Sequence, residues 1–344
     1  MRTLIVVLAC GMLGACSVPR ILHRTVIDYD ESVSRAQAEL LLLNIARARH
    51  GRPLHFTTVS GIAATFEVSA GGSVGAEIGE GAAPTLGLVG VSGNVIENPT
   101  MSILPVQGEE FTRRVLTPLD EQKFEVFYHQ GVDPGLLLRL LAVSLVDEDG
   151  TQHANGSAAF EERVAIIGST ALDVGPIEFD QFYALPKGTQ PSALDVSELV
   201  EKGFRIELGE EPRLIRRVLG RKMIADFDPK SVPNERRRAL HERAQRYPAN
   251  FVLVELEQWR GWIKLRSFHA IVQRAARNIG GEGVLVVEEA GAAPTDALFS
   301  VGYADRVYSV SRESALAFDV LYQLFQMTVT DLGSNRVPPV TIAK

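Results

Sequence analysis

The chain has 344 residues and a formal net charge of −7 at pH 7, from 35 lysines and arginines against 42 aspartates and glutamates. This acidic balance argues against general nucleic-acid binding, which needs a basic surface. Apolar residues make up 46% of the chain and charged residues 22%, which is typical of a globular protein with a sizeable core.

The N-terminal residues combine a basic start with a short apolar run. Arg2 precedes a mostly apolar segment, residues 4–13, which is too short to cross a bilayer and typical of the core of a signal peptide. Residues 13–16, Leu-Gly-Ala-Cys, then look like the lipobox of the bacterial lipoprotein pathway. We therefore predict cleavage before Cys16 and several acyl chains on it, enough for stable membrane anchoring. The alternative is a plain signal peptide with a chance cysteine.

The residue after the predicted anchor indicates a destination. Ser17 is not an aspartate, and in many Gram-negative bacteria this favours transfer to the outer membrane, with the chain facing the periplasm. Cys10 would leave with the signal peptide and Cys16 would be acylated, so no free thiol would remain. Disulfides, thiol catalysis and cysteine-ligated metals are thereby excluded.

Loop signals divide the rest of the chain. We predict a signal peptide at residues 1–15 and a lipidated tether at 16–25. A first region, 26–150, would hold a helix, a long β-hairpin and further helices, and a second region, 151–344, would mix helices and strands. The boundary is placed at the acidic, glycine- and asparagine-containing turns of residues 147–157. The predicted fold class is α+β.

The first region begins with a helix and continues with an alternating, glycine-rich segment. Ser34 to Gln37 has the form of a capping box, which predicts that a helix starts there and ends before Gly51. From residue 56 to 105, apolar and polar residues alternate for much longer than an average strand. We predict one long hairpin that turns at residues 79–84 and has a β-bulge near Leu88, where the alternation changes phase.

The remaining elements follow from periodicity and capping signals. Helices are predicted at residues 108–116, 120–129, 133–145, 233–246, 267–279 and 313–327. Strands are predicted at residues 204–208, 251–256, 284–287, 298–301 and 307–310. In the last helix, the residues expected to be buried are Leu316, Phe318, Val320, Leu321, Leu324 and Phe325.

Several short segments together resemble a family of uncharacterised proteobacterial lipoproteins. They are LLLLNIAR at 40–47, PLHF at 53–56, PVQGEEF at 105–111, LTPL at 116–119, LRS at 265–267, YSV at 308–310 and QLF at 323–325. The resemblance is scattered over most of the chain and implies a lipoprotein. It carries no established activity and no catalytic residues.

No constellation of residues indicates catalysis or a cofactor. Residues 71–75, Gly-Gly-Ser-Val-Gly, match a nucleophile-elbow string but lie inside the predicted hairpin, where the required strand-turn-helix context is missing. The glycines at 280–283 precede a strand and not the helix that a dinucleotide site needs. His50 and His55 are the closest histidine pair and have no third metal ligand in sequence. We predict no cofactor, no metal and no enzymatic activity.

Three pairs of aspartates are each open to a functional and a structural interpretation. The pairs are Asp28 with Asp30, Asp147 with Asp149, and Asp226 with Asp228. They could bind calcium or act in acid-base chemistry, but in turns and at strand ends aspartates usually cap backbone groups.

Residues 205–278 hold 17 lysines and arginines against 9 acids. Such a run is usually a solvated helix face, and the alternative is an anionic partner: phospholipid headgroups, lipopolysaccharide phosphates, peptidoglycan carboxylates or an acidic protein. The candidate residues are Arg213, Arg216, Arg217, Arg221, Arg236, Arg237 and Arg238.

These observations favour a non-catalytic, lipid-anchored scaffold or assembly component of an envelope complex, with a protein partner or copies of itself. The alternative is a subunit of an oligomeric outer-membrane β-barrel pore built from the hairpins, as in the curli-secretion lipoprotein channel, with Glu67 and Glu77 lining the lumen. A third hypothesis, an envelope-polymer hydrolase, lacks a catalytic constellation.

Overall fold

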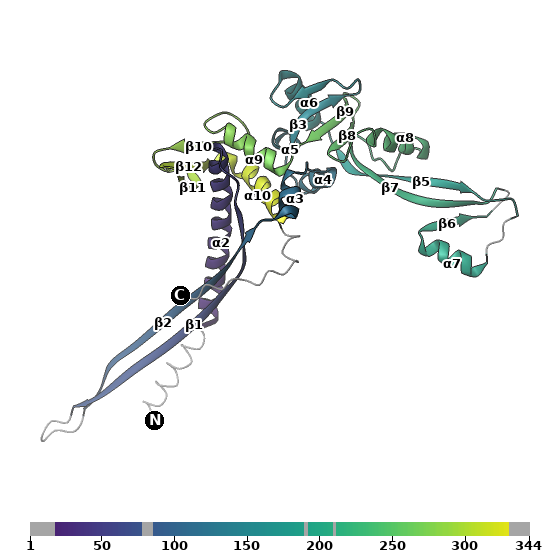
Figure 1. Ribbon diagram of the computed structural model, residues 1–344. Coiled ribbons are helices and arrows are strands. Elements are labelled where there is room, and N and C mark those ends of the chain that lie inside the picture. Colours follow the sequence, from purple (N-terminus) through teal and green to yellow (C-terminus); the bar gives the residue numbers. More distant parts are fainter. Residues whose placement is uncertain (1–17, 78–84, 189–191, 209–210, 330–344) are drawn as a thin grey trace. The chain divides into compact units, whose positions relative to one another are not determined.

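The computed structural model describes residues 18–77, 85–188, 192–208 and 211–329, which form two compact units (Figure 1). The first unit comprises the described parts of Met1–Leu41 and Leu54–Gln107, and the second comprises Leu42–Pro53 and the described parts of Gly108–Asp331. Helices and mixed sheets together give an α+β architecture, which confirms the predicted class.

The first helix starts earlier than the sequence predicted. Helix α2 spans Val18–Arg49, so Ser34 lies inside it and most of the predicted tether, residues 18–25, is helical. Pro19 falls in the first turn, where proline is tolerated, and no glycine or further proline follows before Gly51. With no residue to break the helix, the local capping option at Ser34 is not used.

The predicted long hairpin is present. Strand β1, Phe56–Glu77, pairs antiparallel with β2, Thr85–Val106, as a two-stranded sheet. Ser73 pairs with Gly90 but Val74 pairs with Leu88, which leaves Val89 as an extra residue and confirms the predicted bulge. A second irregularity lies between Val59 and Gly61. The predicted turn at 79–84 lies outside the described residues.

Two sheets lie in the second unit. The larger has the strand order β4-β3-β9-β8-β7-β5, with β6 paired to β7, and the smaller has the order β10-β12-β11. The strands of the larger sheet are β3 Ala142–Asp147, β4 Gln152–Ala154, β5 Asp173–Ala184, β6 Phe204–Glu207, β7 Arg213–Ala225, β8 Phe251–Glu255 and β9 Arg260–Leu265. Those of the smaller sheet are β10 Val287–Ala290, β11 Ala297–Tyr303 and β12 Arg306–Ser311.

The helices of this unit agree with most of the predicted ones. They are α3 Glu109–Leu116, α4 Glu121–His129, α5 Pro134–Leu141, α6 Ala158–Ser169, α7 Ala193–Glu201, α8 Asn234–Ala244, α9 Phe268–Arg277, the 3-10 turn η1 Arg312–Ser314 and α10 Ala315–Val329. Side-chain caps set two of the predicted starts, because Asp133 accepts from Leu136 N–H and Ser267 from Ala270 N–H.

Several predicted details are wrong. The helix predicted at 133–145 ends at Leu141, and the chain continues as β3, where Val143 and Val146 favour a strand and Ser144 pairs with Lys264 of β9. Strands β3 and β4, which lie on either side of residue 150, pair within one sheet of the second unit.

At the C-terminal end of this unit, the strand predicted at 284–287 occupies Val287–Ala290. In α10, Leu316 is exposed, whereas Phe318, Val320, Leu321, Leu324 and Phe325 are buried as predicted.

Strands β5 and β7 form a ribbon that the sequence analysis missed. Only residues 223–225 of β7 pair with β8, while the rest of the strand pairs with β5 and, at its far end, with β6. The β5–β7 ribbon thus continues beyond the sheet and carries β6 and α7 at its far end (Figure 1).

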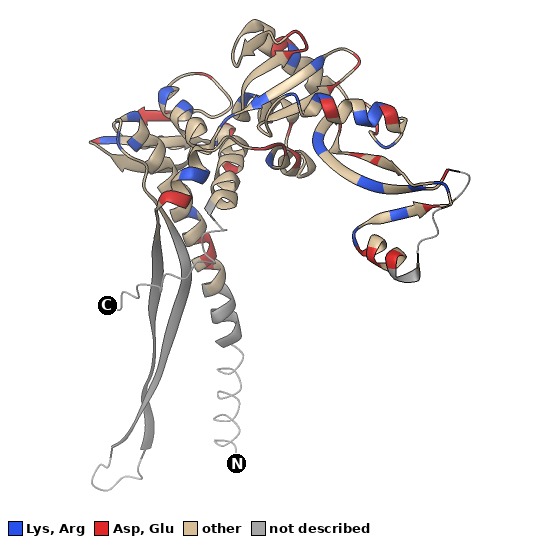
Figure 2. Cartoon of the chain, turned by 45° about the vertical axis from the view of Figure 1, so that its right-hand side comes forward, with Lys and Arg blue, Asp and Glu red and all other residues tan. Residues whose placement is uncertain are grey.

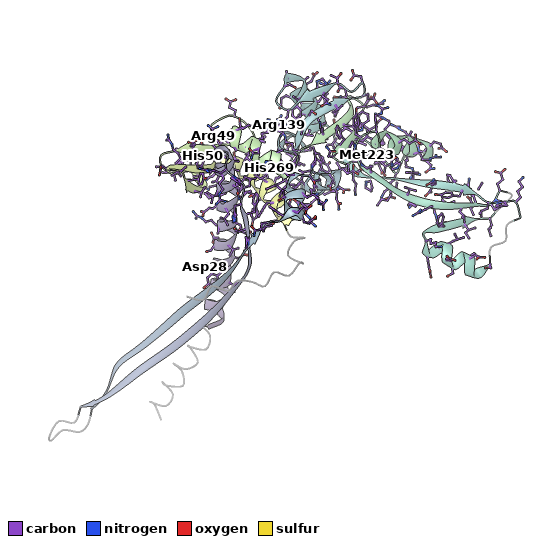
Figure 3. All side chains as sticks on the ribbon, viewed as in Figure 1. Asp28, Arg49, His50, Arg139, Met223 and His269 are labelled. Atoms are coloured by element: carbon purple, nitrogen blue, oxygen red, sulfur yellow. The ribbon has the colours of Figure 1, made fainter. Side chains whose placement is uncertain are left out.

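The ribbon begins at a β-bulge next to the core. Gly220 and Arg221 oppose Ile177 alone, which is the two-against-one count of a β-bulge. A side chain at Gly220 would meet the His241 ring at 2.4 Å and the Ile177 carbonyl at 2.8 Å, so glycine is required for this close approach. Next to the bulge, Met223 is fully buried in a core cluster with Leu253 and Trp262 (Figure 3).

Candidate interaction surfaces

The β1–β2 hairpin presents long unpaired strand edges. Each strand has 22 residues, which corresponds to roughly 70 Å at 3.3 Å per residue. In the described part of the chain no third strand joins this sheet. An isolated two-stranded hairpin is only marginally stable in water, and unpaired backbone N–H and C=O groups are a template for another strand. The hairpin is therefore a candidate assembly surface.

The predicted lipidation site, Cys16, lies outside the described residues. No helix in the described ranges is both long and apolar enough to cross a membrane.

Arg221, one of the arginines predicted to bind an anionic partner, is instead engaged inside the fold. Its guanidinium donates to the carbonyl oxygens of Tyr247 and Phe251, at 2.9 and 2.7 Å, and forms an ion pair with Glu121. Further donations reach the carbonyls of Ala244 and Pro248. These partners lie up to 100 residues away in sequence, which is why sequence reasoning could not detect them.

The other predicted arginines of this group lie on β7, and the structure partly neutralises them. Arg213 forms an ion pair with Glu207 and stacks over the Phe182 ring, 4.7 Å from its centroid. Arg217 lies 3.5 Å from Asp180. Arg216 stacks over a phenylalanine ring of β6, at 5.5 Å, and makes no ion pair in the described part of the chain. The group therefore lies on a strand with mixed charge and not on a helix face, with Arg216 on the opposite side of the strand from Arg213 and Arg217.

The second group lies on α8. Arg236 stacks over the Phe227 ring at 4.7 Å, and Arg238 is exposed and makes no ion pair among the described residues. Arg237 is half-buried, and within the same ranges its Nε atom has no hydrogen-bond partner. In Figure 2 the cartoon is coloured blue at lysines and arginines of β7 and α8, and red at acidic residues of α7. Helix α8 packs against β5 and β7, so the arginines of α8 and those of β7 lie on neighbouring elements.

Apolar residues exposed on the ribbon accompany these arginines and were not predicted. Phe182, Tyr183 and Leu219 are 42%, 38% and 67% exposed. Phe182 and Tyr183 are successive residues of β5 and so lie on opposite faces of the ribbon, which means that the three side chains do not form one apolar patch. The alternation Ile177-Glu178-Phe179-Asp180 was the signal that could have revealed the strand that carries two of them.

The predicted pairs of acids serve structural roles wherever their hydrogen bonds are described. Asp147 accepts hydrogen bonds from Arg163, His153 and Trp259. Burial alone would raise the pKa of the Asp147 carboxyl, but these donors outweigh it and hold the pKa well below its usual value.

Backbone N–H groups engage three more of these aspartates: Asp149, Asp226 and Asp228 each accept one, at 2.9, 2.7 and 2.8 Å. Among the residues that the structure describes, no group of His, Cys, Asp or Glu has the arrangement of a metal site.

No protein-family model, curated protein or solved structure matches this chain.

Proposed function

We propose that this chain is a lipid-anchored, non-catalytic scaffold protein of the bacterial envelope, which assembles with copies of itself through the β1–β2 hairpin. The observation that carries the proposal is the pairing of two 22-residue strands with each other alone, in the described residues. A hairpin of this length leaves two long edges of backbone donors and acceptors, and a neighbouring copy offers edges of the same length. Pairing between copies would satisfy the backbone hydrogen bonds of these edges.

Two further features support the proposal. The sequence pattern at Cys16 supports an anchor that would concentrate the copies on one membrane, which favours weak contacts between them. Outside the hairpin, the acidic pairs with described hydrogen bonds cap backbone groups or form ion pairs, as expected of a chain whose polar residues hold a fold together.

The test of self-assembly compares the lipidated chain with a variant whose hairpin is shortened in register. Replacement of 66–97 by a two-residue Asn-Gly turn removes the outer part of both strands from the pair formed by Phe66 and Glu97 onward, and lets the remaining pairs keep their partners. Purified in mild detergent, the wild type should form a higher oligomer and the variant should be monomeric, as measured by analytical ultracentrifugation. A monomeric wild type, or an unchanged oligomer in the variant, would refute assembly through the hairpin.

The anchor is tested separately. Metabolic labelling with palmitate should mark the wild type, whereas Cys16→Ser should lose the label and accumulate as the uncleaved precursor. Label retained in Cys16→Ser would refute the anchor without bearing on self-assembly.

A second candidate function is an oligomeric membrane pore formed by the hairpins. It is favoured by strand length, because 22 residues exceed the roughly 9–11 that a tilted strand needs to span a bilayer. The oligomer should then conduct ions in planar bilayers, and Glu67→Gln with Glu77→Gln should lower its preference for cations. An oligomer without conductance would leave the scaffold as the sole proposal.

A further inference from the structure

A cleft of about 340 Å³ lies between α5, α6, α9 and the loop that precedes β10. Its size falls within the range of small-molecule sites, and it combines an apolar wall with a few polar groups, as such sites do. Ile271, Ala275 and Leu285 form the buried apolar part of the lining, and Arg139 and Arg274 contribute guanidinium groups. Arg139 lies in the body of the second unit, away from the β5–β7 ribbon (Figure 3).

Asn155 fixes the geometry of this cleft. Its side-chain N–H group donates to the carbonyls of Arg139 and Ala142, at 3.0 and 2.9 Å, and so caps the C-terminal end of α5. Its side-chain oxygen accepts from the Arg274 guanidinium at 2.9 Å. One amide therefore holds Arg274 of α9 in place while most of the guanidinium N–H groups stay available.

The cleft is backed by an excess of positive charge. Arg266, just before α9, is 8% exposed, and its guanidinium donates to the carbonyl of Leu140, a residue of the cleft lining, at 3.2 Å. Burial, and then the charges of Arg274 and Arg277, lower the pKa of Arg266 to about 10. Within the described ranges, none of these three arginines forms an ion pair with a carboxylate.

Two acidic residues also line the cleft and offset part of its positive charge. Glu161 lies 2.8 Å from Arg139 and neutralises it. Glu282 is exposed, and its backbone carbonyl accepts from Asn278. With Arg139 and Glu161 paired, the ionisable groups left in the described lining are the exposed guanidinium of Arg274 and the exposed carboxylate of Glu282. Behind the lining, the buried guanidinium of Arg266 has no counter-ion among the described residues, and the exposed Arg277 adds a further positive charge. Because a buried guanidinium without a counter-ion is unfavourable, an anion in the cleft would stabilise this arrangement.

We propose that this cleft binds a small organic anion, whose phosphate or carboxylate group is held by Arg274 and by the field of Arg266 and Arg277. Its apolar part would contact Ile271, Ala275 and Leu285. The planar guanidinium can donate two parallel hydrogen bonds to a phosphate or to a carboxylate group. The buried apolar wall favours a ligand that also has an organic, apolar part. This inference is independent of the proposed self-assembly, because none of the cleft residues belongs to the hairpin.

Calorimetric titration of the full-length lipidated chain in detergent tests the proposal, with inorganic phosphate, glycerol 3-phosphate and succinate as probes. At least one probe should bind saturably with one site per chain. Arg274→Gln should weaken that binding roughly tenfold to a hundredfold, the loss expected for one charged hydrogen bond. Glycerol 3-phosphate binding alone would indicate a phosphate ligand, such as a lipid headgroup, and succinate alone a carboxylate.

The matched control is Arg205→Gln on β6, which removes the same charge outside the cleft lining and should leave binding unchanged. Arg274→Lys keeps the charge without the fork and should bind with intermediate affinity, and the thermal unfolding of each variant shows whether the fold persists. No saturable binding of any probe at millimolar concentration, or an equal loss in Arg205→Gln, would overturn the assignment.

Discussion

Glu121 and Arg221, which are 100 residues apart in sequence, form an ion pair that fastens the start of α4 to the root of the β5–β7 ribbon. Glu121 also accepts the backbone N–H of Lys222 at 3.0 Å, so one carboxylate bonds to two successive residues of β7. Both side chains of the pair are largely buried. Removal of either partner leaves the other buried without its counter-charge.

Arg221→Gln should therefore destabilise the second unit by about 3–5 kcal/mol, the cost of breaking a buried ion pair. Denaturant unfolding followed by circular dichroism measures the change. Arg238→Gln serves as the matched control and should stay within about 0.5 kcal/mol of the wild type. Equal stability of the two variants would mean that the carbonyl contacts of Arg221 contribute nothing.

Gly261→Ala should destabilise the sheet where β9 pairs with β3. A Cβ at this position would lie 2.2 Å from the Val146 carbonyl oxygen and 2.7 Å from the Trp259 ring. The neighbours are backbone and a ring in the core, so we expect a loss of about 1–3 kcal/mol or more. Gly302→Ala in β11 has nothing within 4 Å and should change the free energy of unfolding little. A tolerated Gly261→Ala would contradict the close approach.

Asp147 should make the stability of the protein sensitive to acid. Its carboxyl has a lowered pKa in the folded state, so the unfolded chain binds more protons in mild acid. The stabilisation is complete above the unfolded pKa of about 4 and is lost as pH falls towards the folded pKa. The wild type should lose more stability than Asp147→Asn between pH 6 and pH 3. Parallel pH profiles would show that Asp147 is not the group responsible, and Glu201→Gln on the exposed α7 is the control.

The arginines without carboxylate partners should mediate any binding to anionic surfaces. The variant combines Arg216→Gln, Arg236→Gln and Arg238→Gln in the unlipidated chain. Its binding to phosphatidylglycerol vesicles should weaken by roughly a hundredfold at low salt, at about 1 kcal/mol per charge. Added salt should shrink the difference. Arg217→Gln, whose partner Asp180 already compensates its charge, should have a smaller effect; equal binding by all chains would favour a solvated face.

Features set by local sequence were predictable, and features set by distant partners were not. The hairpin, its bulge at Val89 and the Ser267 cap all follow from alternation or from residues within four positions. The change from helix to strand after Leu141 depends on pairing with β9, more than a hundred residues away.

The same limit applied to the candidate sites. The arginine group at 213–222 was recognised as a charge cluster, but its strand conformation and the inward position of Arg221 depend on β5, α4 and α8. The cleft arginines went unnoticed because Arg139 and Arg274 are single residues on two separate helices.

Strand β7 runs without interruption from Arg213 beside β6 to Ala225 beside β8. A partner that pulls on β6 or α7 would therefore load the core directly, since on this side no flexible loop joins the ribbon to the sheet. The force would act along the strand and shear the parallel pairs at residues 223–225, while Arg221 and its carbonyl partners resist the displacement. The bulge at Gly220 and Arg221, where the ribbon leaves the sheet, is therefore the point at which such a force would enter the core.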